Sequence, residues 1–167
     1  MHESGFRRAV QRIREPFVLV CGYGDAGELV TRELAEDGIR VVVIDNNLER
    51  VQKVEIDELP MGVPALHAAA VEPGVLLQAG ITHPCCIATL ALTGEDAANL
   101  AVTLNSRLLA PGLETVCVAH NHEQQAAMAR VGDTHIVNPA DAFAVRLAEL
   151  ITRPACTSST NRLPPRP

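Results

Sequence analysis

Short apolar runs alternate with helix-like segments six times along this chain, and this alternation limits the possible folds more than any other feature. The apolar runs cover residues 17–21, 39–45, 63–67, 85–92, 115–119 and 135–137. Helical patterns follow them at residues 25–37, 46–56, 73–79, 94–109, 122–131 and 140–151. Continuous apolar runs are typical of strands that are buried on both faces of a parallel sheet. We therefore predict an α/β fold with helices on both faces of a parallel sheet.

A glycine-rich loop lies between the first apolar run and the first helix after it. It reads Gly22-Tyr23-Gly24-Asp25-Ala26-Gly27, which is a G-x-G-x-x-G motif in its required setting between strand and helix. In such a loop the first glycine permits a tight turn, the second lets a phosphate approach the backbone, and the third lets helix and strand pack closely. The helix start offers free N–H groups and a positive dipole end.

An acidic residue ends the second apolar run at the spacing that a dinucleotide site requires. Asp45 lies 21 residues after Gly24. A carboxylate there accepts hydrogen bonds from both ribose hydroxyls and repels a 2′-phosphate. The motif and Asp45 together predict nucleotide binding by a Rossmann-like, doubly wound, six-stranded sheet with strand order 3-2-1-4-5-6. The open alternative is a βαβ unit whose glycines serve packing alone.

Three parts are expected along the chain. Residues 1–15 form a basic, amphipathic lead-in or linker, in which Phe6, Val10 and Ile13 share one helical face. Residues 16–151 hold all the predicted strands and form the nucleotide-binding domain. Residues 152–167 are rich in proline and polar residues and are expected to be a disordered tail.

Composition argues against nucleic acid as a partner and against a membrane span. The net charge is −6, aromatic residues make up 2%, and tryptophan is absent. A nucleic-acid binder needs a basic face and stacking side chains. No apolar run approaches the roughly 20 residues that cross a bilayer. The five cysteines are odd in number and form no C-x-x-C pair, which indicates reduced thiols.

Neither an active site nor a metal site emerges from the side chains. A short-chain dehydrogenase needs a tyrosine and a lysine four residues apart, whereas this chain has one tyrosine, Tyr23, and one lysine, Lys53. Positioned acid–base groups beside the cofactor are therefore missing. The grouping of Cys117, His120 and His122 matches no closed zinc template, and we assign no metal ligand.

The sequence resembles the N-terminal, nucleotide-binding lobe of RCK domains (regulator of potassium conductance), found in Trk- and Kef-type regulators and in ligand-gated potassium channels. The resemblance covers about residues 17–151, and Asn99 is its most telling single residue. It is carried by Cys-Gly-Tyr-Gly-Asp-Ala-Gly at 21–27, Val-Val-Val-Ile-Asp at 41–45, Leu-Leu-Gln-Ala-Gly-Ile at 76–81, Ala-Leu-Thr-Gly-Glu-Asp-Ala-Ala-Asn-Leu at 91–100, Gly132, and Ile-Val-Asn-Pro at 136–139.

The resemblance implies a cytosolic, non-catalytic domain that binds NAD(H), ADP, ATP or AMP and gates a potassium pore. It also implies a role for each matching position. The phosphates would lie at Gly22, Tyr23, Gly24 and Gly27, and Asp25 and Ala26 of the same loop would also belong to the binding site. The adenosine ribose would lie at Asp45 and Asn46, the adenine at Ala69 and Ala70, and the distal ribose or nicotinamide at Ala91, Leu92 and Thr93.

Three positions depart from the pattern of the family. Asp25 stands where an arginine that can meet phosphate is common, and we expect it to be the N-cap of the following helix. Ala68-Ala69-Ala70 replaces Gly-Asp-Ala, so a carboxylate that recognises adenine or ribose is missing, and His120 replaces an arginine. Two further readings stay open: a dimerisation module of this family without nucleotide, and a small NAD-dependent oxidoreductase.

The resemblance also implies partners and a location. The partner would be the membrane subunit or pore domain of a potassium channel or transporter, with the domain cytoplasmic, at the inner face of the membrane if it is attached to a pore. The predicted helix at 94–109 is apolar beyond what one buried face requires. We therefore expect a homodimer or a higher gating-ring oligomer.

Overall fold

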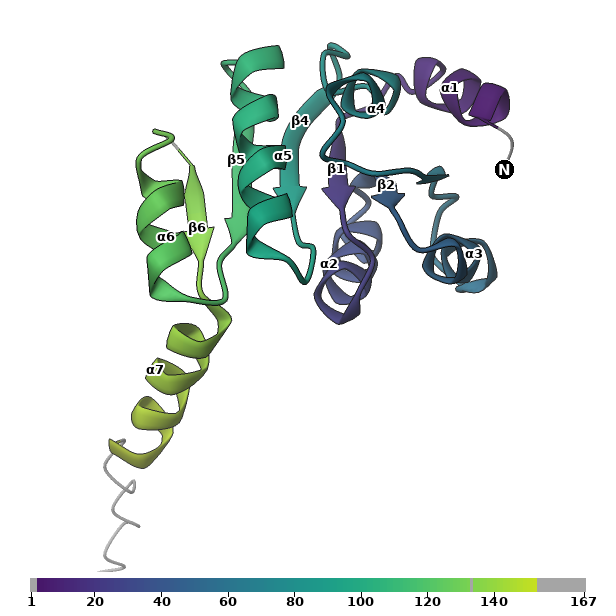
Figure 1. Cartoon of the computed structure of the whole chain (residues 1–167). Helices are drawn as coiled ribbons and strands as arrows, with labels where there is room; N and C mark the ends of the chain where they lie inside the picture. The colour runs from purple at the N-terminus through teal and green to yellow at the C-terminus, as the bar shows by residue number, and fades with distance from the viewer. Residues whose placement is uncertain (1–2, 133, 153–167) are drawn as a thin grey trace, which may run out of the picture.

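Six parallel strands form one sheet in the computed structural model, which describes residues 3–132 and 134–152. Their spatial order is β3-β2-β1-β4-β5-β6, which confirms the predicted fold class (Figure 1). The strands are β1 (Phe17–Cys21), β2 (Arg40–Asp45), β3 (Ala65–His67), β4 (Cys86–Ala91), β5 (Glu114–Val118) and β6 (His135–Val137). The third strand is shorter than predicted and begins after Pro64, a residue that has no N–H to donate to the ladder.

Helices connect the strands, and their bounds differ from the predicted ones by one or two residues. They are α1 (Glu3–Gln11), α2 (Asp25–Glu36), α3 (Leu48–Ile56), α4 (Pro73–Gln78), α5 (Asp96–Leu109), α6 (His122–Ala129) and α7 (Pro139–Thr152). The start of α3 is well defined because the side chain of Asn47 accepts hydrogen bonds from the backbone N–H groups of Glu49 and Arg50. This cap holds the first turn of α3 beside the end of β2.

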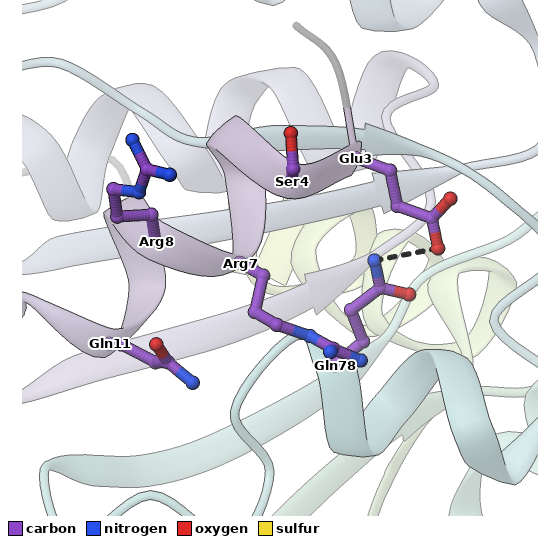
Figure 2. A pocket seen from close by; sticks show the side chains of 6 residues that line it. All are labelled: Glu3, Ser4, Arg7, Arg8, Gln11 and Gln78. Carbon is purple, nitrogen blue, oxygen red and sulfur yellow. Dashed lines mark hydrogen bonds between the residues drawn. The ribbon is translucent and has the colours of Figure 1, made fainter.

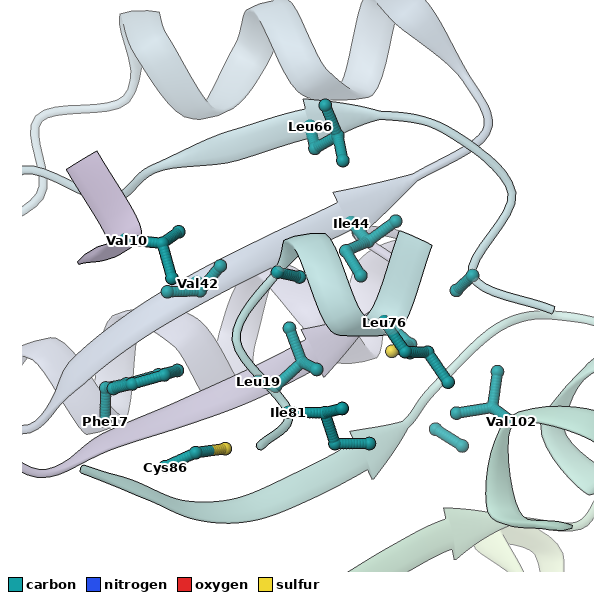
Figure 3. Packing of buried hydrophobic residues seen from close by; sticks show 14 of the residues in the cluster. Val10, Phe17, Leu19, Val42, Ile44, Leu66, Leu76, Ile81, Cys86 and Val102 are labelled. Carbon is teal, nitrogen blue, oxygen red and sulfur yellow. The ribbon is translucent and has the colours of Figure 1, made fainter. Parts of the chain in front are cut away.

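Two apolar clusters lie on opposite faces of the sheet, because successive strand residues point to opposite sides. On one face, Leu19 and Ile44 pack with Leu76 of α4 and Val102 of α5 (Figure 3). On the other face, β1 and β2 pack against α2 and α3 through Val18, Val20, Val41, Val43, Val51 and Val54. Helices therefore cover both faces of the sheet, and its edge at the carboxyl ends of the strands is left for loops.

The buried face of α2 is not the one that its apolar spacing suggests. The spacing of Ala26, Leu29, Val30 and Leu34 predicts one buried face that includes Leu29. This side chain is instead 64% exposed. The helix instead buries Gly27, Thr31 and Ala35. The glycine sets this rotation, because a Cβ at Gly27 would lie 2.0 Å from the carbonyl oxygen of Gly22. Only a residue without a side chain can occupy that contact, so the face next to the sheet begins at Gly27.

The basic lead-in packs onto the domain. Phe6, Val10 and Ile13 are buried in the same cluster as β1. Figure 3 shows Val10 in this cluster. Gly80 makes room for this contact, because a Cβ there would come within 2.7 Å of Val10 and 3.2 Å of Phe17. The predicted helical face of this segment is therefore part of the core.

The last described helix, α7, extends away from the sheet (Figure 1). It buries no residue, and its exposed apolar side chains are Phe143, Val145, Leu147, Leu150 and Ile151. The predicted disordered tail at 152–167 falls outside the described residues except for Thr152, which ends this helix.

Candidate functional site

The glycine loop forms the tight turn that its motif predicts. Gly22 has φ +104°, a left-handed conformation that side chains disfavour. A Cβ there would lie 2.8 Å from the backbone nitrogen of Thr93, so the loop after β1 rests directly on the loop after β4. At Gly24, by contrast, the nearest atoms to a Cβ belong to the Arg50 guanidinium at 3.9 Å. A side chain at Gly24 would therefore meet no backbone atom from elsewhere in the chain closer than 3.9 Å, and the nearest group on this side is the Arg50 guanidinium.

Asp45 connects the end of β2 to the glycine loop. Its carboxylate accepts a hydrogen bond of 2.6 Å from the backbone N–H of Tyr23 and one of 2.7 Å from the backbone N–H of Asn47. The residue is 4% exposed. A carboxylate offers about four acceptor positions, so two remain for hydroxyl groups of a ligand. The predicted acidic residue thus both holds the loop and keeps acceptors available.

The side chain of Tyr23 points away from the phosphate region. It is 2% exposed, and its hydroxyl donates a hydrogen bond of 2.9 Å to Asp57, just after α3. Burial raises the pKa of the Tyr23 phenol, and the bond to Asp57 raises that pKa further. Tyr23 is therefore a neutral anchor between the loop and α3, and only its backbone remains near a nucleotide.

Asp25 is not the N-cap of α2, which corrects the prediction. The N-cap is Gly24, no side chain caps this helix, and Asp25 is the first helical residue. Its exposed carboxylate helps to raise the pKa of Lys53, an effect led by the hydrogen bond between Lys53 and Glu28. The prediction failed because a glycine can also take the cap position. The negative charge of Asp25 is still beside the helix start.

A cavity of about 380 Å³ opens at the carboxyl ends of β1 and β2. Its lining brings together the following residues that the sequence singled out: Gly22, Asp45, Asn46, Ala69, Ala70 and Thr93. It is completed by Ile44, Arg50, Val71, Gly94, Glu95, Ala98 and Val102. The alanines give the cavity an apolar wall, and Asp45 and Arg50 give it a charged one. This combination suits a ligand with a flat apolar ring and a polar sugar phosphate.

Other predicted site residues do not line this cavity. Ala91 is fully buried in the core cluster, and Leu92 packs against the cluster on the α2 and α3 face. Strand alternation turns Leu92 to the opposite side from Ala91 and Thr93, and of these three residues only Thr93 lines the cavity. The rest of the glycine loop after Gly22 lies outside the lining too.

A buried amide holds the loop after β4 in place. Asn99 of α5 is fully buried and accepts a hydrogen bond of 2.9 Å from the backbone N–H of Thr93. It donates to the carbonyl oxygens of Thr93 and Val118, both at 3.0 Å. The ends of β4 and β5 are thereby joined by one side chain. Asn99, which the family resemblance singled out, thus acts by positioning the wall of the cavity.

His120 forms a second link at this edge of the sheet. Its Nδ1 lies 2.6 Å from the carboxylate of Asp96, which also accepts the backbone N–H of His120 at 2.9 Å. Burial alone would raise the pKa of Asp96, but the hydrogen bonds from His120 and Asn121 outweigh it and leave that pKa below its usual value. The histidine thus fixes the loop after β5 to the start of α5.

Arg50 is the site residue that the sequence analysis missed. It lines the cavity, and its Nη1 lies 3.7 Å from Oδ2 of Asp45. The available signal was its place five residues after Asp45, in the first turn of the helix that follows β2. Nothing in the sequence showed that this long side chain turns back over the glycine loop.

A second hollow, of about 440 Å³, lies beside α1, near the start of β1 rather than its end. Figure 2 shows the basic side chains of Arg7 and Arg8 around it, with Gln78 hydrogen-bonded to Glu3. It contains none of the predicted nucleotide-binding residues. Within residues 3–132 and 134–152, no group of side chains could hold a metal ion. None of the described helices is long and apolar enough to cross a membrane.

The fold, the glycine loop and Asp45 define the class of Rossmann-type nucleotide-binding domains. Residues 18–139 match the TrkA-N domain, and the chain belongs to this family. It is 29% identical over 149 residues to "Probable potassium channel protein 2" of Methanocaldococcus jannaschii, covering 89% of this chain and 42% of that protein. It is 33% identical over 100 residues to a "Trk system potassium uptake protein TrkA homolog" of Pyrococcus horikoshii, covering 60% of this chain and 42% of that protein.

Solved structures share the fold at low sequence identity. The TrkA-N domain of the inner membrane protein ybaL from Escherichia coli has a TM-score of 0.73 at 22% identity and covers 81% of this chain and 96% of its own. The GsuK channel bound to NAD has a TM-score of 0.67 at 16% identity, and the match covers 81% of this chain and 23% of the channel chain. The Shewanella denitrificans Kef CTD in AMP-bound form has a TM-score of 0.68 at 19% identity, covering 82% of each chain. The chain spans 20% to 42% of the length of the curated relatives it matches.

Proposed function

We propose that this chain is a regulatory domain that binds an adenine nucleotide and thereby gates a potassium channel or transporter. The observation that carries the proposal is the cavity where Asp45 meets the glycine loop. The relatives named as potassium channel and potassium uptake proteins support the link to potassium transport. Solved structures of the same fold with bound NAD or AMP support an adenine nucleotide as the ligand.

The chemistry of the cavity supports adenosine recognition. Asp45 keeps acceptors for ribose hydroxyls beside Asn46, and Ala69 and Ala70 offer an apolar surface to a purine ring. The volume of about 380 Å³ lies within the usual range of small-molecule sites. The phosphates would then extend toward Gly24 and the start of α2. The nucleotide would be NAD(H), ADP, ATP or AMP.

The proposal includes the assembly in which the domain acts. Residues 16–151 would form the nucleotide-binding lobe, at the cytoplasmic side of a membrane subunit or pore domain. It would act there as a homodimer or a higher gating-ring oligomer, since soluble oligomers commonly form closed, symmetric assemblies. No enzymatic role is proposed, since the phenol of Tyr23 is engaged with Asp57 and Lys53 with Glu28, both outside the cavity lining.

Titration calorimetry with NADH, NAD, ADP, ATP and AMP, each with and without a divalent cation, tests the proposal. We expect saturable binding of at least one nucleotide with a dissociation constant below about 1 mM. Oxidation of NADH in the presence of candidate substrates would instead support the alternative that the protein is a small NAD-dependent oxidoreductase.

A dimerisation module without nucleotide is the second candidate, and two observations favour it. Asp25 places a negative charge beside the phosphate region, and no carboxylate stands at Ala69 or Ala70. Failure of all five nucleotides to bind a folded, oligomeric protein would establish this candidate over the first.

A further inference from the structure

Arg50 projects from α3 across the glycine loop and covers the side of Gly24 on which no backbone atom from elsewhere in the chain lies closer than 3.9 Å to a Cβ. We propose that Arg50 is the phosphate-binding side chain of this cavity, an inference that rests on the proposed nucleotide-binding function. It would supply the positive charge that position 25 lacks. The argument depends on where the guanidinium lies, on what it contacts and on what it leaves free.

The backbone of Arg50 is held close to the cavity. Its N–H donates to the side chain of Asn47, the N-cap of α3, at 3.3 Å. The backbone N–H of Asn47 in turn donates to Asp45 at 2.7 Å. Two consecutive hydrogen bonds therefore connect the backbone of Arg50, through Asn47, to the carboxylate of Asp45 at the end of β2. A short, fixed connection of this kind lowers the entropic cost of placing a long side chain.

The guanidinium lies flat over the glycine loop. Its Cζ, Nη1 and Nη2 atoms are all 3.9 Å from the position that a Cβ of Gly24 would occupy. Equal distances from three atoms of the group mean that its plane faces Gly24. The N–H groups lie in that plane and point past Gly24, so a phosphate would bind at the edge of the guanidinium, beside the loop.

Most of the binding capacity of Arg50 is unused. Its contact with Asp45 is 3.7 Å, too long for a hydrogen bond, and its side chain is 48% exposed. In the described part of the chain, its guanidinium donates no hydrogen bond. A half-exposed ion pair of this kind contributes little to stability. Five N–H donors in a planar fork thus remain for a ligand, and this geometry matches phosphate.

The charge around the cavity is net negative, so an anionic ligand would depend on Arg50 there. Of the described residues that line the cavity, Arg50 is the only basic one, and Asp45 and Glu95 are the acidic ones. Asp25 adds a further negative charge at the start of α2. Without Arg50, a nucleotide phosphate would meet three carboxylates and only the backbone N–H groups. With Arg50, one cation lies between the phosphate and Asp45.

The test compares ligands with and without phosphate. Calorimetry would measure adenosine, AMP and ADP against the parent, Arg50→Gln and Arg50→Lys, with Arg146→Gln on α7 as the matched control. We expect Arg50→Gln to weaken ADP binding about tenfold and adenosine binding less than about twofold. Arg50→Lys should lie between, because lysine keeps the charge but loses the fork. Equal loss for adenosine and ADP, or no loss for either, would overturn the inference.

A direct readout separates this inference from the proposed function. The Arg50 side-chain N–H signal would be followed by NMR during titration with inorganic pyrophosphate and, separately, with ADP. A shift with pyrophosphate supports the inference even if adenosine fails to bind, in which case only the adenine assignment fails. Binding of ADP with an unchanged Arg50 signal overturns the inference and leaves the proposed function standing. A protein that binds neither ligand contradicts both.

Discussion

Asp45 has two tasks at the centre of the cavity. It holds the glycine loop through the N–H of Tyr23, and it faces the space where a ribose would lie. Both tasks need the ionised carboxylate, because the groups that it meets on the protein side are backbone donors. In the proposed site, selectivity for the sugar would therefore be decided mainly by Asp45, with Arg50 3.7 Å away as its counter-charge.

We predict that NADP(H) binds about tenfold more weakly than NAD(H), because its 2′-phosphate would meet the carboxylate of Asp45. The Asp45→Asn variant should narrow this difference. It should also lower the free energy of unfolding by about 1.5–3 kcal/mol, since one of two charge-assisted hydrogen bonds is lost. Calorimetry and chemical denaturation measure the two effects. Equal affinities of the parent for the two nucleotides would remove Asp45 from ribose recognition.

Asp25→Asn removes a negative charge beside the phosphate region without touching a cap, because Gly24 is the N-cap of α2. We predict that the variant binds nucleotide roughly two- to fivefold more tightly. The gain is small because the charge of Asp25 is exposed to solvent of high dielectric constant. The unfolding free energy should fall by about 0.3–1 kcal/mol, because a carboxylate in the first turn stabilises the helix dipole. Asp37→Asn, at the other end of α2, is the control. The opposite result would be weaker nucleotide binding by Asp25→Asn, together with equally weakened binding by the parent when a chelator is added. It would indicate a divalent cation that bridges Asp25 and the phosphate.

Among the elements, the contact between β1 and α2 sets the geometry of the loop between them. The carbonyl oxygen of Gly22 lies where a side chain at Gly27 would begin. Because both partners are backbone, neither can move aside without displacing the strand or the helix. The loop that carries Gly24 is thus held at both ends.

We predict that Gly27→Ala lowers the free energy of unfolding by about 3 kcal/mol, since its Cβ would lie 2.0 Å from that oxygen. Gly74→Ala in α4 is the matched control, because a Cβ there meets no atom of the described residues within 4 Å. In that control, the free energy of unfolding should rise by about 0.4–1 kcal/mol. Urea denaturation of both variants measures the difference. A Gly27→Ala protein as stable as the parent would show that α2 is not fixed by this contact.

Sequence patterns predicted the elements well where one local rule governs them. The parallel strands followed from continuous apolar runs, and the loop turn followed from Gly22, which has φ +104°. The face of α2 was mispredicted because a backbone contact at Gly27, and not the apolar stripe with Leu29, decides its rotation. Arg50 could not be placed, since the direction of a long, half-exposed side chain depends on the tertiary contacts around Asp45.

At the scale of the whole molecule, large exposed apolar side chains lie on α7 and on the part of α5 that follows its cavity-lining residues Ala98 and Val102. On α5, Leu104 is 44% and Leu108 is 78% exposed. On α7, Phe143 is 65% and Ile151 is 82% exposed. Large apolar side chains grouped on one helix commonly mark contacts with another protein surface. The oligomer expected from the sequence therefore has two candidate contact helices.

We predict that the protein is a dimer or a larger assembly at concentrations on the order of tens of micromolar. Phe143→Ser combined with Ile151→Ser should shift it toward the monomer, because two apolar contacts would be lost without disturbing the core. Leu29→Ser, on the exposed side of α2, is the control. Light scattering coupled to size exclusion measures the mass, and a monomeric parent would contradict this prediction.

The central claim is that an adenine nucleotide binds between the glycine loop and Asp45. Amide NMR spectra during titration with NADH and with ADP test this claim most directly, because each backbone N–H near the ligand reports its own position. We predict saturable shifts at Gly22, Gly24 and Asn46, with little change at Arg7 and Arg8 beside the second hollow. Unchanged spectra, or shifts confined to the hollow beside α1, would contradict the account.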